Sequence, residues 1–140
     1  MGIRHAKTGD ASGIQRLLEQ LEYPGSGAGL ESRLERMLKD PAEVLLVWEE
    51  DRKIGGFLSL HFIPQIAMEG DFARISYFAV DEAVRGQGIG LAMEEEATRL
   101  ARERGCYLIE VHCHERRTRA HAFYSRQGYE ESPKYLIKRM

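Results

Sequence analysis

Arg85-Gly86-Gln87-Gly88-Ile89-Gly90 separates an apolar run at residues 75–80 from a helical pattern that begins at Ile89. The apolar run predicts a strand, so the hexapeptide is a glycine-rich turn between a strand and a helix. Three glycines in five positions leave backbone N–H groups uncovered by side chains. The first turn of a helix adds further unpaired N–H groups and partial positive charge. The turn therefore predicts a site for a phosphate group, most simply a pyrophosphate.

Strand and helix patterns surround this turn on both sides. Before it, apolar residues predict two helices. The first has apolar residues spaced i, i+3, i+4 and i+7 and is capped by Asp10, and the second has Leu38 on its buried face. After it, a helix runs to Gly105 with Glu94 facing water, and a last helix contains Phe123 and Tyr124. The expected strands are residues 3–6, 44–48, 54–63, 71–80, 107–113, 129–131 and 135–138. This order predicts an α/β fold with a mixed, mostly antiparallel sheet and helices on both faces.

The composition narrows the class of protein. The chain has 140 residues, which predicts one domain over residues 1–140. Its net charge of −2 argues against a nucleic-acid binder, and no apolar stretch approaches the ~20 residues of a membrane span. Cys106 and Cys113 lack the spacing of a disulfide framework. We therefore expect a cytoplasmic protein whose partners include neither nucleic acid nor membrane.

Glycine-rich turns of this kind serve three common ligands. A nucleoside-triphosphate loop ends in Gly-Lys-Ser/Thr, which this chain lacks. A dinucleotide loop has G-x-G-x-x-G near the first strand, whereas this chain has G-x-G-x-G after about 80 residues. The third ligand is acyl-coenzyme A, bound by the loop of the GNAT superfamily of N-acetyltransferases through the pattern Arg/Gln-x-x-Gly-x-Gly/Ala. Arg85, Gly88 and Gly90 match that pattern in register.

A second segment extends the resemblance. Ala120-His121-Ala122-Phe123-Tyr124-Ser125-Arg126-Gln127-Gly128-Tyr129 is similar to the superfamily's late motif, Ala-x-x-Phe-Tyr-x-x-x-Gly-Phe/Tyr. Residues 3–11 resemble its opening strand and helix cap, so the resemblance covers essentially the whole chain. Within the superfamily the pattern most resembles small-molecule acetyltransferases such as the aminoalkylphosphonate N-acetyltransferases.

The resemblance implies where acetyl-CoA binds and which group protonates the leaving thiolate. The pyrophosphate is expected on the backbone N–H groups of the turn, and the pantetheine arm along the strand before it. Tyr124 falls where the superfamily carries its catalytic tyrosine, and a phenol can donate a proton at neutral pH. Arg117 stands where an asparagine is frequent, and it could meet a phosphate. The expected cofactor-binding residues are Phe78, Ala79, Val80, Arg85, Gly86, Gln87, Gly88, Ile89, Gly90, Arg117 and Tyr124.

The general base is not placed by the resemblance. Tyr77 stands where many relatives have a glutamate, and a tyrosine is not an anion at neutral pH. Strand alternation puts Glu110, His112 and His114 on one face, so Glu110 could take the proton through water, or His112 could take it directly. Water alone can also serve an amine of modest basicity. The same three residues could share a metal ion, yet no further ligand has the right spacing, and we predict no metal site.

These features predict an N-acetyltransferase that moves acetyl directly from acetyl-CoA to a primary amine of a small molecule. A non-catalytic module that senses acyl-CoA remains an alternative, because the expected glutamate is missing at Tyr77. Acetylation of a protein or peptide amine is a second alternative, and a nicotinamide-dependent oxidoreductase a third. The superfamily also makes a homodimer an expected assembly. The sequence does not identify the acceptor.

Overall fold

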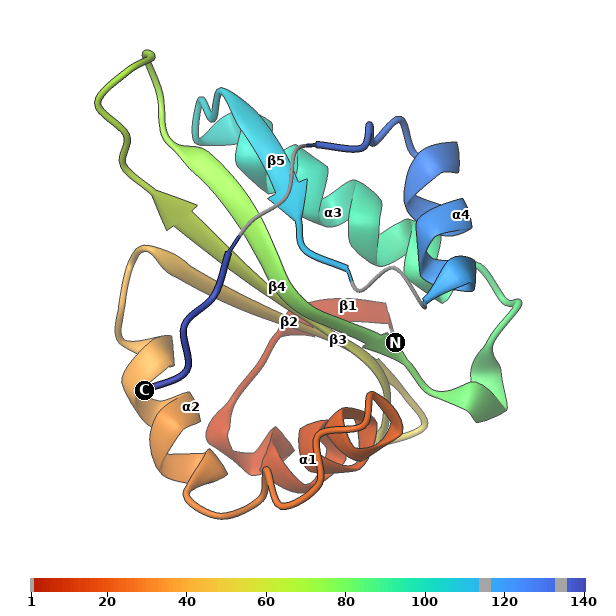
Figure 1. Cartoon of the computed structure of the whole chain (residues 1–140). Helices are drawn as coiled ribbons and strands as arrows, with labels where there is room; N and C mark the ends of the chain where they lie inside the picture. Colours follow the sequence, from red (N-terminus) through yellow and green to blue (C-terminus); the bar gives the residue numbers. More distant parts are fainter. Residues whose placement is uncertain (1, 114–116, 133–135) are drawn as a thin grey trace.

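The computed structural model describes residues 2–113, 117–132 and 136–140. A five-stranded sheet forms its centre, with helices on both sides (Figure 1). In chain order the elements are β1 (Gly2–His5), the short 3-10 helix η1 (Thr8–Asp10), α1 (Ala11–Gln20), α2 (Leu30–Leu38), β2 (Glu43–Glu50), β3 (Lys53–Ile63), β4 (Phe72–Val80), the 3-10 helix η2 (Glu82–Val84), α3 (Ile89–Glu103), β5 (Leu108–Val111) and α4 (Thr118–Arg126).

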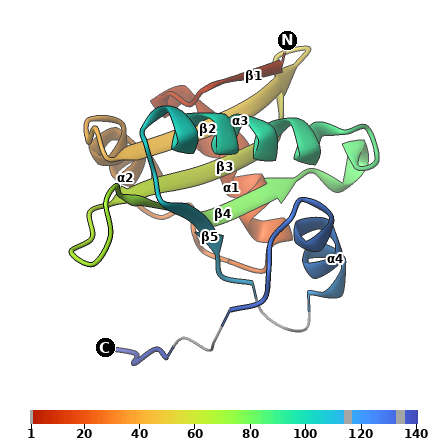
Figure 2. The same cartoon turned by 90° about the horizontal axis from the view of Figure 1, so that it is seen from above.

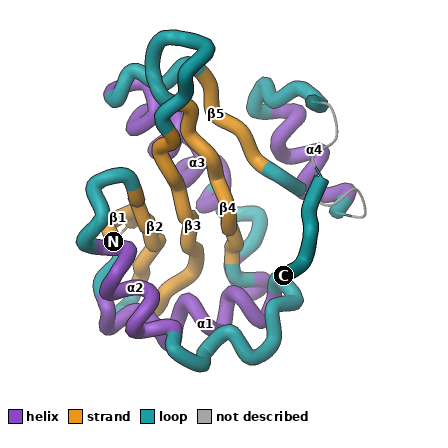
Figure 3. The backbone as a smooth tube through the Cα atoms, turned by 60° about the vertical axis from the view of Figure 1, so that its left-hand side comes forward, coloured by secondary structure: helices purple, strands orange, loops and turns teal. Residues whose placement is uncertain are grey.

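The strands lie in the sheet in chain order, and this simple topology positions the site. Neighbours are antiparallel from β1 to β4, whereas β5 runs parallel to β4. The parallel pairing joins residues 72–75 to residues 108–111 and stops there. Beyond Ile75 and Val111 the two strands diverge, as Figure 3 shows. The predicted mixed, mostly antiparallel α/β sheet is confirmed.

Two β-bulges shift the register of the central strands. In the β2–β3 hairpin, Trp48 pairs with Gly56 but Glu49 pairs with Ile54, so Gly55 is the extra residue. Between β3 and β4, Ser59 pairs with Tyr77 and Leu60 with Ile75, so one extra β4 residue, Ser76, opposes no partner. A bulge redirects side chains locally and is frequent beside active sites. The second bulge lies where β4 begins to part from β5.

Alternation along the strands divides the apolar side chains between two cores. One core joins α1 and α2 to one face of the sheet, and the other joins α3 to the opposite face (Figure 2). The apolar stripe of α1, Ile14, Leu17 and Leu18, is buried against the first face as its spacing predicts. Gly56 lets the start of α3 approach the second face closely, because a Cβ there would lie 2.9 Å from Met93 Sδ.

Several expectations about single elements are wrong. Glu94 is buried rather than solvated, and Leu38 is exposed rather than buried. Asp10 accepts hydrogen bonds from the Arg4 side chain and the Lys7 N–H, so it holds the turn before α1 rather than the first amides of α1.

The predicted C-terminal strands are also wrong within the described residues. Residues 129–131 and 136–138 form no strand, and Tyr135 lies outside the described residues. Tyr129 instead closes α4, because its N–H donates to the Tyr124 carbonyl at 3.0 Å after Gly128 has turned the chain at a φ of 91°. None of the helices in the described ranges has the length and apolarity to cross a membrane.

Candidate active site

The glycine-rich turn leads from β4 into α3 with its backbone open to solvent. Gly86 and Gly88 have φ angles of 84° and 80°, a region that residues with a Cβ rarely adopt. A Cβ at either position would meet no atom of the described residues within 4 Å. Within the described ranges, no protein group accepts a hydrogen bond from the N–H groups of Gly86, Gln87 or Gly88. Three free donors thus stand at the N-terminus of a 15-residue helix.

Asp81 fixes the start of this turn to α1. Its carboxylate accepts hydrogen bonds from the Arg16 guanidinium at 2.5 Å, from Gln20 at 3.2 Å and from the Ala83 N–H at 3.1 Å. The Ala83 N–H, with the Arg16 guanidinium, lowers the pKa of Asp81 from 3.8 to about 2. Arg16 also donates to the Ile54 carbonyl at 2.7 Å. The turn therefore begins from an anchored residue although its centre is exposed.

The end of β4 meets α4 beside this turn. The Phe78 ring lies 5.9 Å from the Phe123 ring and 6.4 Å from the Tyr124 ring, measured between centroids. A Cβ on Gly90 would lie 3.6 Å from Phe123 and 3.7 Å from Val80. The predicted cofactor segments at residues 78–80 and 85–90 and the late motif therefore come together, although residues 91–119 separate the turn from the motif.

Tyr124 has a partly buried ring and a hydroxyl with no hydrogen-bond partner in the described part of the chain. Burial raises the pKa of Tyr124 well above its usual value, and the Cys113 thiol and the Glu94 carboxylate raise it further. The phenol is therefore protonated throughout the physiological range. Its ring also packs against Tyr129, whose centroid is 5.2 Å away.

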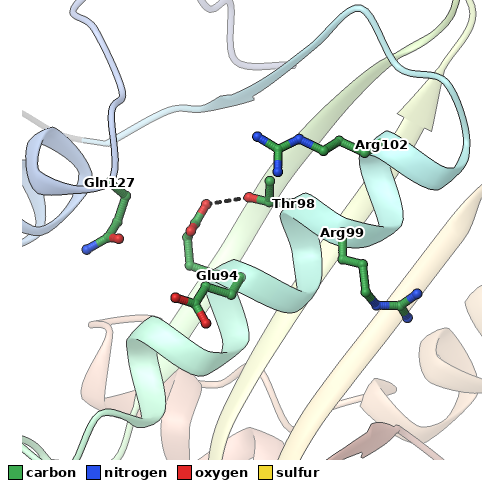
Figure 4. A pocket seen from close by; sticks show the side chains of 6 residues that line it. Glu94, Thr98, Arg99, Arg102 and Gln127 are labelled. Carbon is green, nitrogen blue, oxygen red and sulfur yellow. Dashed lines mark hydrogen bonds between the residues drawn. The ribbon is translucent and has the colours of Figure 1, made fainter.

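A charged hollow of about 370 Å³ lies between α3 and Gln127 (Figure 4). Glu94 is buried at its edge, where its carboxylate accepts hydrogen bonds from the Thr98 hydroxyl at 2.7 Å and the Tyr129 hydroxyl at 3.0 Å. These two donors explain how a carboxylate tolerates burial in the α3 side of the molecule. The hollow is lined by Glu94, Glu95, Thr98, Arg99, Arg102 and Gln127, none of which belongs to the predicted site.

The opposite face of the sheet holds a second cavity, of about 420 Å³, which we call the α1–α2 chamber. Its lining is mostly apolar and comes from α1, α2, the loop between them and strands β2, β3 and β4. Tyr23 from the loop packs edge-on against Tyr77 of β4, with centroids 5.2 Å apart. The lining residues are Leu18, Tyr23, Ser26, Leu30, Arg33, Leu34, Met37, Leu45, Phe57, Ser59, His61, Ser76 and Tyr77.

One polar group of this chamber was missed by sequence reasoning. His61 on β3 contacts the Glu43 carboxylate of β2 through Nδ1, and its Nε2 lies 2.5 Å from the Ser76 hydroxyl. Ser59 Oγ is 3.4 Å from the same Nε2. Strand alternation alone could place Ser59 and His61 on one face, but Glu43 and Ser76 are 18 and 15 residues away.

The predicted bases on β5 lie at the edge of the same face. Arg74 donates to the Glu110 carboxylate at 2.6 Å, so that carboxylate already has a cationic partner. His112 Nε2 is 4.0 Å from Glu110. His114, the third member of the predicted row, lies outside the described residues. In the part of the chain that the structure describes, no group of His, Cys, Asp and Glu side chains could hold a metal ion.

Arg117 at the start of α4 and the two cysteines are further residues that the sequence singles out. Arg117 donates to the Leu21 carbonyl at 2.9 Å and lies 3.8 Å from the Glu22 carboxylate, so it links α4 to the end of α1 rather than to the glycine-rich turn. Burial raises the pKa of the Cys106 and Cys113 thiols. Neither thiol is thereby activated as a nucleophile.

Comparison with known proteins gives a consistent set of matches. The acetyltransferase (GNAT) family model matches residues 13–129. The aminoalkylphosphonate N-acetyltransferase of Salmonella typhimurium is 28% identical over 135 residues, which cover 93% of this chain and 85% of the relative.

Two solved structures show how far the fold agrees. A Bacillus halodurans C-125 protein described as a transcriptional regulator superposes with a TM-score of 0.88 at 27% identity, covering 99% of this chain and 98% of its own. An aminoglycoside N-acetyltransferase in complex with CoA superposes with a TM-score of 0.85 at 16% identity, covering 99% and 93% of the two chains. The second match shows the fold alone.

Proposed function

Since this chain belongs to the acetyltransferase (GNAT) family and is an acetyl-CoA-dependent N-acetyltransferase, we propose that it acetylates a primary amine of a small molecule bound in the α1–α2 chamber. The position of the chamber supports the proposal. The chamber reaches Ser76 and Tyr77, where the pairing of β4 with β5 has ended, and the glycine-rich turn lies at the end of the same strand. A donor held at the turn and an acceptor held in the chamber would meet along β4.

The residues of the turn fit acetyl-CoA. Free N–H groups at Gly86, Gln87 and Gly88 suit a pyrophosphate, and no side chain of the described residues occupies the space beside Gly86 and Gly88. The backbone of residues 78–80 is not covered by β5, because the parallel pairing stops at Ile75. That backbone can bond an extended arm as a further strand would. When bound, acetyl-CoA supplies an activated acetyl group with a thiolate as its leaving group.

Tyr124 is proposed as the acid that protonates the thiolate. Its hydroxyl keeps its proton at neutral pH and has no protein partner in the described ranges that would compete for it. Proton donation by a positioned side chain typically contributes 10²–10⁴-fold to a rate. Glu110 and His112, the bases predicted from the sequence, lie on the β5 side, where Glu110 already pairs with Arg74.

The lining favours an acceptor whose amine is carried on an apolar body. Arg33 is the fixed cation among the lining residues, and its guanidinium already donates to the carbonyls of Ala28 and Ser26 at 2.7 and 2.6 Å. An anionic acceptor would compete with those two bonds. Ser26 Oγ is buried without a partner in the described part of the chain, so it can receive one polar group of the acceptor. The relative from Salmonella typhimurium is named for phosphonates, so this chamber predicts a different preference.

Release of free coenzyme A thiol, measured with a panel of amines, tests the proposal. We expect 2-phenylethylamine and hexylamine to raise thiol release well above the rate without amine, and 2-aminoethylphosphonate to raise it less. If acetyl-CoA binds but no amine raises thiol release, the chain is a sensing module, and the proposal is wrong. A strict preference for the phosphonate would contradict only the assignment of an apolar acceptor.

A further inference from the structure

We propose that His61, oriented by Glu43, is the general base that takes the proton from the acceptor amine. The inference rests on the proposed function, because it assumes that an amine occupies the α1–α2 chamber. It assigns the base to β3, whereas the sequence directs attention to β5. The geometry of three side chains carries it.

The two ring nitrogens of His61 have different partners. Nδ1 contacts the Glu43 carboxylate, which can only accept, so Nδ1 carries the hydrogen of the neutral ring. Nε2 then holds a lone pair directed at the Ser76 hydroxyl, 2.5 Å away. An acidic partner that fixes the tautomer leaves the opposite nitrogen free to accept a proton, and its charge stabilises the imidazolium that forms. Glu43 is therefore a positioning residue and His61 the base.

The place of His61 in the sheet fits this role. Its side chain is 21% exposed and lines the chamber, so an amine can reach it while bulk water is largely displaced. Ser76 is the bulged residue of β4, and the first residue after the pairing with β5 ends. The lone pair of Nε2 therefore points to the position where the chamber borders the part of β4 that no longer pairs with β5. A thioester lying along β4 would present its carbonyl carbon near that position.

Around His61, the charged side chains other than Glu43 are already paired or hydrogen-bonded, so Glu43 is the charge that acts on the ring. Cross-strand pairing places Glu43, His61, Arg74 and Glu110 in one row over four strands. Arg74 pairs with Glu110, which offsets the repulsion between its guanidinium and an imidazolium at His61. Arg33 enters the chamber from α2 but is bound to loop carbonyls. The same pairing occupies the Glu110 carboxylate, which weakens it as a base.

The proposed step balances without another reactant. The amine nitrogen forms a C–N bond with the acetyl carbonyl carbon, and the C–S bond breaks. Near neutral pH the acceptor arrives as an ammonium, so one proton goes from it to His61 Nε2 before the C–N bond forms. The adduct nitrogen then loses its surplus proton to solvent, and the thiolate receives a proton from Tyr124. His61 then returns its proton to solvent and Tyr124 regains one, which restores the starting state.

His61→Gln tests the base by its dependence on pH. Near neutral pH we expect kcat/KM for 2-phenylethylamine to fall by ~10²-fold or more. At about pH 10 a substantial fraction of a primary amine of pKa ~10.4 is already neutral, so the loss should shrink to less than ~10-fold. A merely structural role would give the same loss at every pH. The matched control is His5→Gln on the exposed side of β1, which should retain the wild-type profile.

Companion variants and a binding measurement separate the outcomes. Glu43→Gln should lower kcat/KM with the same pH dependence but by a smaller factor. If His61→Gln does not fold, the pH profile of Glu43→Gln tests the inference in its place. Ser76→Ala should stay within ~10-fold of wild type; a loss as deep as that of His61→Gln would assign the chemistry to Ser76 and overturn the inference. Thermal stabilisation by acetyl-CoA should be unchanged in all three. Wild-type turnover with an unchanged His61→Gln profile overturns this inference alone, whereas absence of wild-type turnover overturns the proposed function as well.

Discussion

Tyr124 lies beside the end of β4, and its phenol O–H donates a hydrogen bond to no group in the described part of the chain. Its ring is held by Phe78, Phe123 and Tyr129, and its pKa is raised mainly by burial. The side chain is thus rigid and protonated, which are the two properties that a proton donor needs. We predict that Tyr124→Phe lowers kcat for the best amine by ~10²-fold or more, because the ring packing survives and only the proton is lost.

Steady-state thiol release measures this effect. Tyr107→Phe is a suitable control, since Tyr107 is exposed just before β5 and this variant should keep the wild-type kcat. The raised pKa of Tyr124 also implies that its ionisation does not shape the rate between pH 6 and 9. A Tyr124→Phe enzyme with an undiminished kcat would remove Tyr124 from the reaction.

Tyr124 could be predicted from the sequence because it belongs to a motif. His61 could not be predicted because it belongs to none. A single histidine in a strand has no spacing that separates a base from a packed or solvated side chain. Its partner Glu43 can be found by counting back from the hairpin turn, but an unbulged hairpin would pair Glu43 with Leu60. The extra residue at Gly55 moves the register by one and brings His61 opposite Glu43. Hydrophobic periodicity does not reveal that bulge.

At the scale of elements, the glycine-rich turn depends on backbone angles that alanine adopts only at a cost. Gly88 begins α3 with a φ of 80° and has open space around it, so Gly88→Ala strains the backbone without a clash. The strain of a residue with a Cβ in this region is about 1–2 kcal/mol. We predict that acetyl-CoA affinity falls by ~10-fold, because relief of that strain turns the N–H groups away from their present directions.

Isothermal titration with acetyl-CoA measures the affinity of Gly88→Ala. Gly9→Ala provides the control, since Gly9 also has open space but no positive φ. If the two variants bind acetyl-CoA equally well, the positive φ at Gly88 has no part in binding.

Asp81 connects α1 to the same turn through hydrogen bonds, and its pKa predicts how their contribution to stability changes in acid. The folded protein holds this pKa at about 2, below the usual 3.8, so the carboxylate stabilises the fold fully above about pH 4 and loses this effect as pH falls toward 2. We predict that Asp81→Asn lowers the free energy of unfolding by about 1–2 kcal/mol at neutral pH. The ion pair with Arg16 contributes only a small part of this loss of stability, because the Arg16 side chain is 39% exposed and solvent screens the pair.

Urea unfolding at several pH values tests the sign. The gap between wild type and Asp81→Asn should be constant from about pH 5 to 8 and should close between about pH 4 and 2. A gap that widens in acid would contradict the assignment. Asp40→Asn is the control, since Asp40 is exposed and its carboxylate accepts a local hydrogen bond from the Ala42 N–H.

Long elements with clear periodicity were predicted well, and the failures have local causes. The stripes of α1 and α3 and the strands β2, β3 and β4 lie within a few residues of their predicted positions. Glu94 was misplaced because its burial depends on Thr98 and on the distant Tyr129. Residues 129–131 have strand-like composition, but Tyr129 donates to α4 and to Glu94, which leaves it no part in the sheet.

At the scale of the whole molecule, the sheet separates two kinds of surface. Its α3 face is closed by the second core, whereas its α1–α2 face keeps a chamber over β3 and β4. Strand β4 links this chamber to the glycine-rich turn, because Ser76 and Tyr77 line the chamber and the turn follows the end of the strand. The motifs predicted this arrangement as a whole because the turn and the Phe123-Tyr124 segment lie on either side of β5. The acceptor chamber could not be predicted in detail, because it combines short contributions from six separate segments.

This arrangement predicts which nucleotide stabilises the whole fold. A ligand that binds only the folded state at 100 times its dissociation constant raises the free energy of unfolding by ~2.7 kcal/mol. We expect this shift from acetyl-CoA, because the turn that would hold its pyrophosphate joins β4 to α3 and is tied to α1 through Asp81. NAD also has a pyrophosphate, but G-x-G-x-G after the fourth strand differs from the dinucleotide pattern near a first strand. Thermal unfolding with each ligand should therefore show a rise in Tm with acetyl-CoA and none with NAD at the same concentration. Stabilisation by NAD alone would show that the turn serves a dinucleotide, and the acyl-transfer chemistry assigned to Tyr124 and His61 would then have no donor.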